Sequence, residues 1–460
     1  MKLVVLSGGS GKRLWPLSNE ARSKQFLRML HNPDGTRESM IQRLWKQLES
    51  NPVSDEVYIS TSPKHAELIQ SQLGSKVCLI TEPEPRDTFP AIALVSAYFH
   101  SELAVGPGEV ITVMPVDPYV GDSFFTTIKQ VEHVLHLSNA DLALVGVAPT
   151  YPSTKYGYII PAVDGVDKNS KKPYQNVIGF QEKPSEREAN MLIDRHALWN
   201  CGVFSFRLEY MIEELKKRGW PADYHRLLGL YGDLPSISFD YEIVEKAERV
   251  VVVPYAGYWK DLGTWNTLIE EIGAQVTGER IITEGCTNTH IISELDLPVV
   301  AIGLSDVVVA ASPDGILVSH KSHSHLVKQV TKDLEQRPMY EERRWGIYQV
   351  LDYQKTGENW EILTKSLHIH AGKNISYQYH RNRSEVWVIV AGEGEFVLND
   401  RMCRVRPGDV AEIPAGARHA IKALTDLNII EVQMGSRLEE EDIVRLAVSW
   451  DEIRERENQD

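Results

Sequence analysis

The stretch that decides the fold lies near the N-terminus and reads Leu3-Val4-Val5-Leu6-Ser7-Gly8-Gly9-Ser10-Gly11-Lys12-Arg13-Leu14-Trp15-Pro16-Leu17. Its first part, Leu3–Leu6, is short and continuously apolar, which is typical of a central strand covered on both faces. A loop with three glycines in four positions follows at once. Such a loop lets the backbone approach a ligand and point its N–H groups at an anion. The stretch therefore predicts an α/β sheet with an anion-binding loop at its edge.

Two familiar phosphate-binding loops do not fit this stretch. A P-loop needs glycine where Leu6 stands and serine or threonine where Arg13 stands, and a dinucleotide fingerprint needs glycine at Leu14. A merely tight, solvated basic turn is the remaining structural alternative. Arg13 and Lys24 favour phosphate binding, because a triphosphate and a leaving pyrophosphate both require fixed cations nearby.

The alternation of strand and helix patterns extends this prediction over residues 1–276. Short apolar runs alternate there with stretches whose apolar residues have helical spacing. The runs are Leu3–Leu6, Val57–Ser60, Val110–Met114, Leu142–Val147 and Val250–Val253, and the helical stretches include Ser39–Leu48 and Phe124–Leu137. This pattern predicts a Rossmann-like domain with a mixed, mainly parallel sheet, and ligands at the carboxyl ends of its strands.

The pattern changes after residue 277. Thr289–Val330 contains short Val/Ile runs broken by Gly, Pro and Asp, which predicts a small, solenoid-like β segment without helices. A charged linker is expected at Lys332–Arg344, a β-barrel or jelly roll from Trp345 to about Val432, and a helical tail at Glu439–Asp460. We expect domains at residues 1–276, 277–335 (with the linker) and 336–460.

Composition excludes several classes of protein. The chain has 460 residues, of which 42% are apolar and 25% charged, as expected for a globular protein of two or three domains. A net charge of −15 argues against broad nucleic-acid binding. No apolar run approaches membrane-spanning length, and the N-terminus does not resemble a signal peptide. Four scattered cysteines fit a reduced environment. We therefore expect a cytoplasmic protein with no nucleic-acid or membrane partner.

The segment from Leu6 to Ser18, together with Lys24-Gln25-Phe26-Leu27, resembles the signature of sugar-1-phosphate nucleotidyltransferases. It is most similar to bacterial mannose-1-phosphate guanylyltransferases of the long type that carries a cupin. The resemblance implies that the loop binds a nucleoside triphosphate and that Arg13 and Lys24 act in catalysis by stabilising its phosphates. The loop residues are Leu6, Ser7, Gly8, Gly9, Ser10, Gly11 and Lys12.

Later segments match the same family in the same order. Glu84–Ala93 resembles its base-contacting segment, which implies that Arg86 and Asp87 bind nucleotide; locally, a loop with Asp87 or Thr88 capping a helix fits equally well. Asp117 follows a buried strand, and a second acid, Asp261, lies far along the chain. Two carboxylates suit Mg²⁺, and the resemblance assigns it to this pair. Pro118 replaces the family's histidine, and isolated acids of this kind are often turn caps.

The sugar side of the family's site also has counterparts here. The segments are Tyr156–Ile159, Phe180–Pro184, Trp199–Phe204 and Asp240–Lys246. The resemblance implies sugar binding by Tyr156, Gly157, Glu182, Asn200 and Gly202, and a catalytic charge from Lys183. It further implies that mannose 1-phosphate attacks the α-phosphorus of GTP in line, giving GDP-mannose and pyrophosphate. The nucleophile is already an anion, so positioning and electrostatics suffice without a general base.

The C-terminal barrel carries a candidate metal site. Gln378, His380, Glu385 and His419 fit the spacing of the two cupin motifs, with Gln378 in place of the usual histidine. Gln378 and His380 share one face of a strand, and such ligands suit Zn²⁺ or another divalent ion. The Gln-x-His form resembles the phosphomannose isomerase half of the family. His368, His370, His320, His323 and His325 lie outside the motifs, and we expect them to be surface residues.

Isomerisation of mannose 6-phosphate to fructose 6-phosphate is thus a second expected activity that the sequence leaves open. Val386 and Ala420 replace a histidine and an arginine of the family, while Arg383 and Arg445 are candidate cations for a substrate phosphate. A cupin that keeps its metal for stability, or only packs against the first domain, is the structural alternative. For the whole chain, the alternatives are a transferase for another sugar 1-phosphate or nucleotide and a non-enzymatic nucleotide-sugar sensor. We expect a homodimer.

Overall fold

The computed structural model describes residues 1–9, 11–32, 34–162, 172–273, 276–334, 336–357, 359–439 and 442–457. The chain forms two compact units. The first comprises Met1–Leu14, Ser23–Ala274 and Lys321–Lys328. The second comprises Trp15–Arg22, Gln275–His320 and Gln329–Asp460. Among the described residues, none of the helices is long and apolar enough to cross a membrane.

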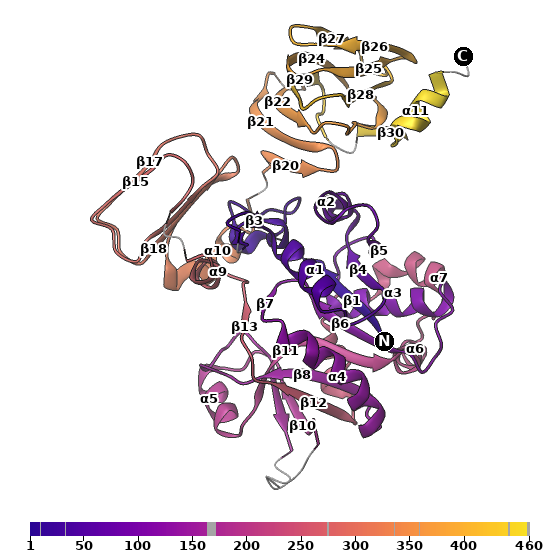
Figure 1. Ribbon diagram of the computed structural model, residues 1–460, viewed down its shortest axis with the longest axis vertical. Helices are drawn as coiled ribbons and strands as arrows, with labels where there is room; N and C mark the ends of the chain where they lie inside the picture. The colour runs from indigo at the N-terminus through magenta and orange to yellow at the C-terminus, as the bar shows by residue number, and fades with distance from the viewer. Residues whose placement is uncertain are drawn as a thin grey trace. The chain divides into compact units, whose positions relative to one another are not determined.

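A nine-stranded mixed sheet forms the centre of the first unit (Figure 1). Its order is β5-β4-β1-β6-β11-β8-β12-β10-β9. The strands are β1 (Lys2–Ser7), β4 (Val57–Thr61), β5 (Cys78–Thr81), β6 (Val110–Pro115), β8 (Leu142–Val147), β9 (Tyr158–Pro161), β10 (Gln175–Gln181), β11 (Leu198–Arg207) and β12 (Val250–Tyr255). Strand β1 pairs in parallel with β4 and β6, whereas β11 runs antiparallel to β6 and β8. The predicted central strands are confirmed, and so is the mixed sheet.

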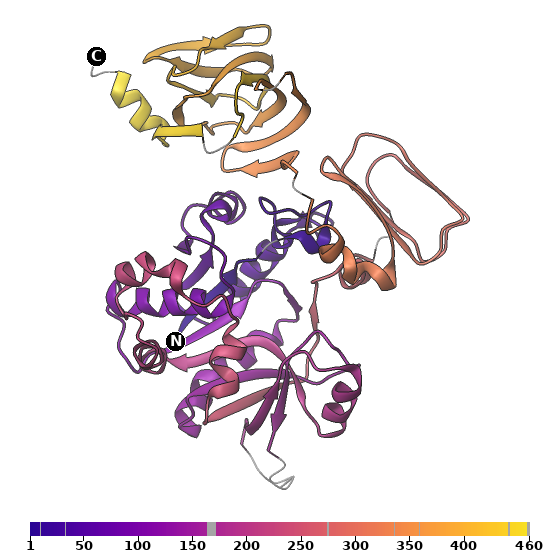
Figure 2. The ribbon, with the colours of Figure 1, turned by 180° about the vertical axis from the view of Figure 1, so that it is seen from behind.

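Helices cover both faces of this sheet, as the front and rear views show (Figure 2). Leu3 and Val5 of β1 pack with α1 (Met40–Ser50), α2 (Pro63–Leu73) and α4 (Ser123–Ser138). Val4 points the other way and packs with α3 (Thr88–Ser101), α6 (Leu208–Lys217), α7 (Tyr224–Gly229) and α8 (Phe239–Glu242). The unit also contains α5 (Glu186–Asp194) and α9 (Trp265–Ile272). Burial on both faces explains why the central strands are continuously apolar.

The β segment of the second unit is built from short parallel strands. Strands β14 (Val276–Thr277), β16 (His290–Ser293) and β18 (Val307–Ser312) pair in parallel in that order, and β15 (Ile281–Glu284) pairs in parallel with β17 (Val299–Ile302). Strand β19 (Gly315–His320) then turns back antiparallel to β18. The expectation of no helix up to Val330 is wrong, because η5 (Lys321–Leu326) and α10 (Val327–Val330) follow β19. In the first unit, η5 packs against α9, a contact between distant segments that local periodicity does not signal.

The C-terminal part is the predicted barrel of two sheets. One sheet has the order β20-β21-β22-β29-β24-β27 and the other β26-β25-β28-β23-β30. Their strands are β20 (Tyr340–Arg343), β21 (Gly346–Lys355), β22 (Glu361–Ile369), β23 (Tyr377–His380), β24 (Arg383–Ala391), β25 (Gly394–Leu398), β26 (Arg401–Val405), β27 (Val410–Ile413), β28 (His419–Ala423), β29 (Leu427–Gly435) and β30 (Ile443–Ala447). Two boundary expectations are wrong: β20 lies inside the expected linker, and β30 precedes α11 (Trp450–Glu457) in the expected helical tail. Strand β20 forms a hairpin with the adjacent β21, whereas β30 pairs with β23, which lies far away in the sequence.

The segment Trp15–Arg22, which follows the glycine loop, packs on the β18–β19 turn within the second unit. Asp314 of that turn is buried and accepts hydrogen bonds from Asn19 Nδ2 (2.7 Å) and the backbone N–H of Met339 (2.6 Å). Ser312 Oγ donates to the carbonyl of Pro16 (2.8 Å), and Arg22 pairs with both carboxylate oxygens of Glu294 (2.8 and 2.9 Å). Polar contacts thus hold residues 15–22, the part of the sequence that separates Arg13 from Lys24.

Replacing Asp314 with alanine is expected to lower the free energy of unfolding by about 1–3 kcal/mol, because two donors lose their acceptor. Urea unfolding of the full chain measures the change. Asp296→Ala, at an exposed position of the same β segment, is the matched control. If both variants unfold at the same urea concentration, Asp314 does not anchor the segment.

Candidate functional site

The glycine loop leaves β1 with its backbone exposed and its underside held by side chains. Thr61 Oγ1 donates to the carbonyl of Ser7 (3.1 Å), and Ser23 Oγ donates to the carbonyl of Gly9 (3.0 Å). Gly9 has a φ of +108°, which other residues rarely adopt. Gly8 and Gly9 are exposed, so their backbone is open to a ligand. Ser10, also assigned to the loop by the sequence, lies outside the described residues.

Glu82 is a buried acid beside this loop that the sequence analysis did not identify. It follows β5, and its Oε1 would lie 3.0 Å from a Cβ placed on Gly8. Tyr231 Oη donates to Glu82 Oε2 (2.7 Å). Burial raises the pKa of Glu82, although the bond from Tyr231 opposes this shift. An acid directly after a short apolar strand was the available signal, similar to the one that identified Asp117.

Lys24 joins the two acids that the sequence analysis proposed as a pair. Its Nζ lies 2.5 Å from Asp117 Oδ2 and 3.6 Å from Asp261 Oδ1. Asp117 follows β6, and β7 (Pro118–Val120) pairs antiparallel with β13 (Trp259–Asp261), which places Asp261 opposite Pro118. Pro118, the departure from the family pattern, thus takes part in the ladder that brings the acids together. The three residues are therefore neighbours, although the sequence analysis paired only the two acids.

Charge interactions perturb all three groups. Burial alone would lower the pKa of Lys24, but the charges of Asp117 and Asp261 hold it above its usual value. Burial would raise the pKa of Asp117, but the adjacent Lys24 and the charge of Arg13 hold it below its usual range. Burial and the charge of Asp117 raise the pKa of Asp261. Four charged groups therefore act on one another here, as in sites that bind charged ligands.

A cleft connects the acid pair to the predicted sugar-side residues. It is lined by Pro115, Asp117, Pro118, Tyr156, Asn200, Cys201, Trp259 and Asp261. The ring of Tyr156 packs edge-on against Trp199 and Trp259, with centroids 5.0 and 5.4 Å apart. The backbone N–H of Asn200 donates to the carbonyl of Gly157 (2.8 Å). Residues that are distant in sequence therefore form one continuous wall.

Several of the sugar-side residues position their neighbours. Asn200 Nδ2 donates to Asp240 Oδ1 (2.6 Å), and Asn200 Oδ1 accepts from the N–H of Gly202 (3.1 Å). Burial, with the charge of Glu182, raises the pKa of Asp240 to about 7. A Cβ on Gly157 would lie 2.4 Å from Glu182 Oε2 and 2.6 Å from Phe180 Cζ, so both side chains would have to move to admit a larger residue. Asn200 thus holds the turn at Gly202 and the Asp240 carboxyl in place.

The remaining predicted residues of the first unit are placed less centrally. Lys183 is exposed and pairs with Glu182 Oε1 (2.8 Å). Arg86 donates to Glu84 (2.6 Å) and to the carbonyl of Leu234 (2.7 Å). Asp87 caps α3 by accepting from the N–H of Thr88 (2.8 Å). Arg86 thus joins Glu84 to the Leu234 carbonyl, and Asp87 is one of the two helix caps that the sequence allowed at this loop. Lys12 and Arg13 lie in η1 (Lys12–Leu14), and Arg13 is exposed.

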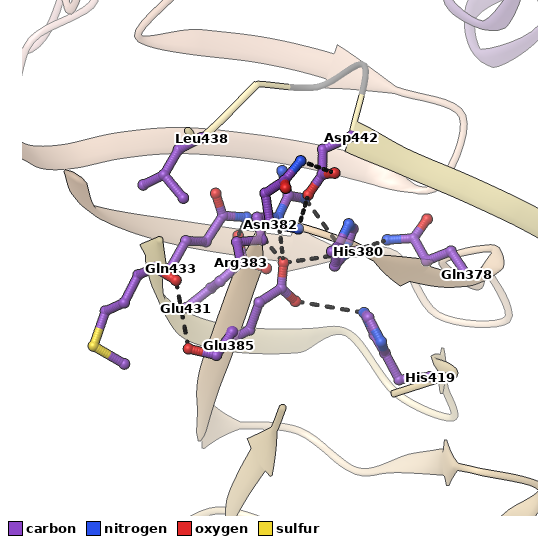
Figure 3. Close-up of polar contacts among 12 residues, drawn as sticks. Gln378, His380, Asn382, Arg383, Glu385, His419, Glu431, Gln433, Leu438 and Asp442 are labelled. Carbon is purple, nitrogen blue, oxygen red and sulfur yellow. Dashed lines mark hydrogen bonds and ion pairs between the residues drawn. The ribbon is translucent and has the colours of Figure 1, made fainter. Parts of the chain in front are cut away.

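The barrel interior holds the four predicted cupin residues in one buried cluster (Figure 3). His380 Nε2 lies 3.2 Å from Glu385 Oε1, and His419 Nε2 lies 3.4 Å from Glu385 Oε2. Potential ligand atoms of these three residues all lie within 4.8 Å of one another. Gln378 Nε2 lies 3.5 Å from His380 Nε2. The sequence prediction that these residues come together is thus confirmed.

The protonation states of this cluster suit a metal ion. His419 Nδ1 lies 3.0 Å from the carbonyl of Ala417, so the neutral ring donates from Nδ1 and its Nε2 lone pair faces the Glu385 carboxylate. Two acceptors facing each other require a cation or a proton between them. His419 Nε2 and His380 Nδ1 are buried and have no hydrogen-bond partner among the described residues. Burial lowers the pKa of His380 to about 4, so this ring is neutral near pH 7.

Arg383 and the two departures from the family pattern occupy unexpected places. The Arg383 guanidinium is buried and donates to Glu385 Oε1 (3.0 Å), so it orients the carboxylate, whereas Arg445 is exposed. Val386 lies between the buried Glu385 and Trp387 and faces away from the interior cluster. Ala420 packs in a separate apolar group with Tyr377 and Trp450. The Val386 and Ala420 side chains therefore both lie away from the interior cluster.

Comparisons with known proteins match both parts of the chain. Residues 2–277 match a family model described as nucleotidyl transferase, and residues 331–448 match one described as mannose-6-phosphate isomerase C-terminal. Xanthan biosynthesis protein XanB of Xanthomonas campestris (strain B100) is 32% identical, covering 96% of this chain and 97% of that protein. A mannose-1-phosphate guanylyltransferase of Salmonella montevideo is 29% identical, covering 96% and 98%. A crystal structure described as mannose-1-phosphate geranyltransferase from Thermus thermophilus superposes with a TM-score of 0.59 at 30% identity, covering 73% and 99%.

Proposed function

The chain belongs to the nucleotidyl transferase family, and on that premise we propose that it transfers the guanylyl group of GTP to mannose 1-phosphate, releasing GDP-mannose and pyrophosphate. The observation that carries the proposal is the single cleft that joins Asp117 and Asp261 to Tyr156 and Asn200, with Lys24 between the two acids. Relatives described as mannose-1-phosphate guanylyltransferases support the choice of sugar and base.

In this proposal the residues of the first unit bind the two substrates and neutralise the negative charge of their phosphates. The backbone from Leu6 to Lys12 binds the triphosphate, and Arg13 and Lys24 neutralise the phosphates as two anions approach each other. Tyr156, Gly157, Glu182, Asn200 and Gly202 shape the sugar side, where Lys183 provides a charge for the sugar phosphate. Arg86 and Asp87 border the nucleotide. The negative charge of the attacking phosphate makes a general base unnecessary.

Asp117 and Asp261 fit a magnesium ion by their chemistry. They are two carboxylates at the edge of a sheet, and they already converge on a cation, the Lys24 ammonium. Asp117 and Asp261 would hold the ion, and it would supply positive charge that neutralises the phosphates. Lys24 and Arg13 remain beside the phosphates in that arrangement.

A pyrophosphate-release assay tests the proposal with GTP, ATP, UTP and dTTP against mannose 1-phosphate, glucose 1-phosphate and heptose 1-phosphate. Release with GTP and mannose 1-phosphate is the expected result. Release with a different pair would assign another substrate, and no release with any pair would favour the sensor alternative. We also propose domain boundaries at 1–276, 277–335 and 336–460 and a cytoplasmic homodimer.

Glu82 is proposed to select guanine. The edge of guanine carries two adjacent donors, N1–H and N2–H, which a carboxylate can accept together, whereas adenine has an acceptor at N1. Glu82→Gln is expected to lower kcat/KM for GTP by about 10- to 100-fold, because one of the paired acceptors becomes a donor. Steady-state rates with GTP and ATP measure the change. Glu49→Gln, at an exposed acid of α1 in the same unit, is the control. An unchanged ratio of GTP to ATP activity would exclude Glu82 from base selection.

A second activity is proposed for the barrel, because its buried residues fit a divalent metal such as Zn²⁺. His380, Glu385 and His419 would hold the ion, with Gln378 contributing its amide oxygen after rotation of the amide. The metal would supply polarisation of a sugar oxygen, and Arg383 would hold Glu385 in position. A coupled assay from mannose 6-phosphate to fructose 6-phosphate, with Zn²⁺ or Co²⁺ added, tests isomerisation. Activity that disappears in His419→Ala is the expected result; no activity with bound metal would favour a stabilising role.

A further inference from the structure

His368 and His370, which were expected to be ordinary surface residues, lie with two other polar residues on one face of strands β22 and β29. In the ladder between β22 and β29, His368 lies opposite Asn428 and Ile369 lies opposite Leu427. The next residue of each chain is His370 on one side and Asp426 on the other. Because side chains alternate between faces, His368, His370, Asp426 and Asn428 form a square on one face. Ile369 and Leu427 are buried, so this square lies on the outside of the barrel.

Three members of this square offer metal-ligating atoms that converge. Potential ligand atoms of His368, His370 and Asp426 all lie within 4.8 Å of one another. The two imidazole rings lie 5.1 Å apart between centroids and are nearly perpendicular, at 78°. His370 and Asp426 are exposed and His368 is half-buried, so an ion can reach them from solvent. Imidazole and carboxylate together suit Zn²⁺, Cu²⁺ and Ni²⁺.

Hydrogen bonds to neighbouring groups fix the orientation of two of the three candidate ligands, His368 and Asp426. His368 Nδ1 lies 2.6 Å from Asn428 Oδ1 and donates its hydrogen there, so Nε2 presents a lone pair. Asp426 Oδ1 accepts from the N–H of Ala371 (2.8 Å), which leaves Oδ2 for another partner. A Cβ on Gly392 would lie 2.1 Å from the carbonyl oxygen of Asp426, so the neighbouring turn packs tightly on this backbone. Metal ligands in proteins are commonly oriented by such hydrogen bonds.

We propose that His368, His370 and Asp426 bind a divalent transition-metal ion on the outer face of the barrel, separate from the interior cluster. The two sites differ in access, because His380, Glu385 and His419 are buried whereas His370 and Asp426 face solvent. The bound ion connects the end of β22 to the turn that precedes β29. Three protein ligands leave further coordination positions for water. The proposal does not depend on the transferase or isomerase activity.

Titration of the chelator-treated full chain with ZnCl₂, followed by calorimetry, tests this site. His370→Ala is expected to bind one equivalent of zinc fewer than the unsubstituted chain, or to bind that equivalent at least 10-fold more weakly. Asp426→Asn is expected to act in the same direction. His196→Ala, at an exposed histidine of the first unit, is the matched control and is expected to bind as the unsubstituted chain does. Equal stoichiometry and affinity in His370→Ala and His196→Ala would overturn the proposal.

Two further measurements separate this site from the interior cluster and from a folding defect. Electron paramagnetic resonance of Cu²⁺ bound to His419→Ala, whose interior cluster keeps one imidazole, is expected to show a site with two coordinated imidazole nitrogens, and that site is lost when His370→Ala is added. Asn428→Ala keeps all three ligands but removes the contact that orients His368; we expect about 10-fold weaker zinc binding, as for other contacts that orient metal ligands. Unchanged circular dichroism in each variant is the control for folding. A Cu²⁺ spectrum that His370→Ala leaves unaltered would contradict the assignment.

Discussion

Replacing Lys24 with alanine is expected to lower the turnover number of nucleotidyl transfer by about 10²- to 10³-fold, the loss typical of one preorganised transition-state donor. The reaction brings two phosphate anions together, and the Lys24 ammonium lies where the acid pair meets the cleft, 2.5 Å from Asp117 and 3.6 Å from Asp261. Its removal costs a positive charge and also leaves two carboxylates facing each other. Steady-state pyrophosphate release at saturating substrates measures the effect.

The control for Lys24→Ala removes a lysine–carboxylate pair outside the cleft. Lys2 Nζ lies 2.8 Å from Glu56 in the same unit, and Lys2→Ala is expected to retain full turnover. Lys24→Arg keeps the charge but spreads it over a planar group, so we expect partial recovery relative to alanine. The double variant Lys24→Ala, Asp117→Asn has one carboxylate fewer, so the repulsion between the two acids is removed. It therefore separates a folding defect caused by that repulsion from the loss of a catalytic charge. Near-unsubstituted turnover in Lys24→Ala would remove Lys24 from the mechanism.

The glycine loop and the central strands could be predicted because their signals are local. Leu3–Leu6 is continuously apolar, since both faces of β1 are covered, and Gly9 has a backbone conformation that favours glycine. Gln378 and His380 could be placed together because they are two residues apart on one strand. The resemblance to the cupin motifs, and not local spacing, added Glu385 and His419 to this pair.

The contacts between distant segments could not be predicted in the same way. Asp117 and Asp261 meet through β7 and β13, two three-residue strands without a periodic pattern. The resemblance supplied their pairing, but not Lys24 between them. Glu82 was missed because its significance depends on the position of Gly8, and Arg383 was assigned to substrate although it binds Glu385. The helical residues after β19 were missed because they have no local apolar pattern. They pack instead against α9, which lies far away in the sequence.

Replacing Asp261 with asparagine is expected to lower turnover by about 10²-fold and to raise the magnesium concentration needed for half-maximal rate by at least about 10-fold, because metal affinity depends on carboxylate charge. Asp117, Asp261, Lys24 and Arg13 together carry no net charge when all are ionised. The neutral amide makes this group a net cation, which repels Mg²⁺ even when the nucleotide brings its own negative charge. Pyrophosphate release measured over a series of MgCl₂ concentrations separates the two effects.

The matched control for Asp261→Asn neutralises an acid that is ion-paired elsewhere in the same unit. Asp141 pairs with Arg249, and Asp141→Asn is expected to leave the magnesium dependence unchanged. Asp117→Asn is expected to differ from Asp261→Asn, because the distance to Lys24 is shorter for Asp117 than for Asp261. Its loss frees the ammonium as well as removing a ligand, so we expect the larger fall in turnover from this variant. If Asp261→Asn and Asp141→Asn require the same magnesium concentration, Asp261 is not a metal ligand, and the positive charge in the cleft comes from Lys24 and Arg13 without it.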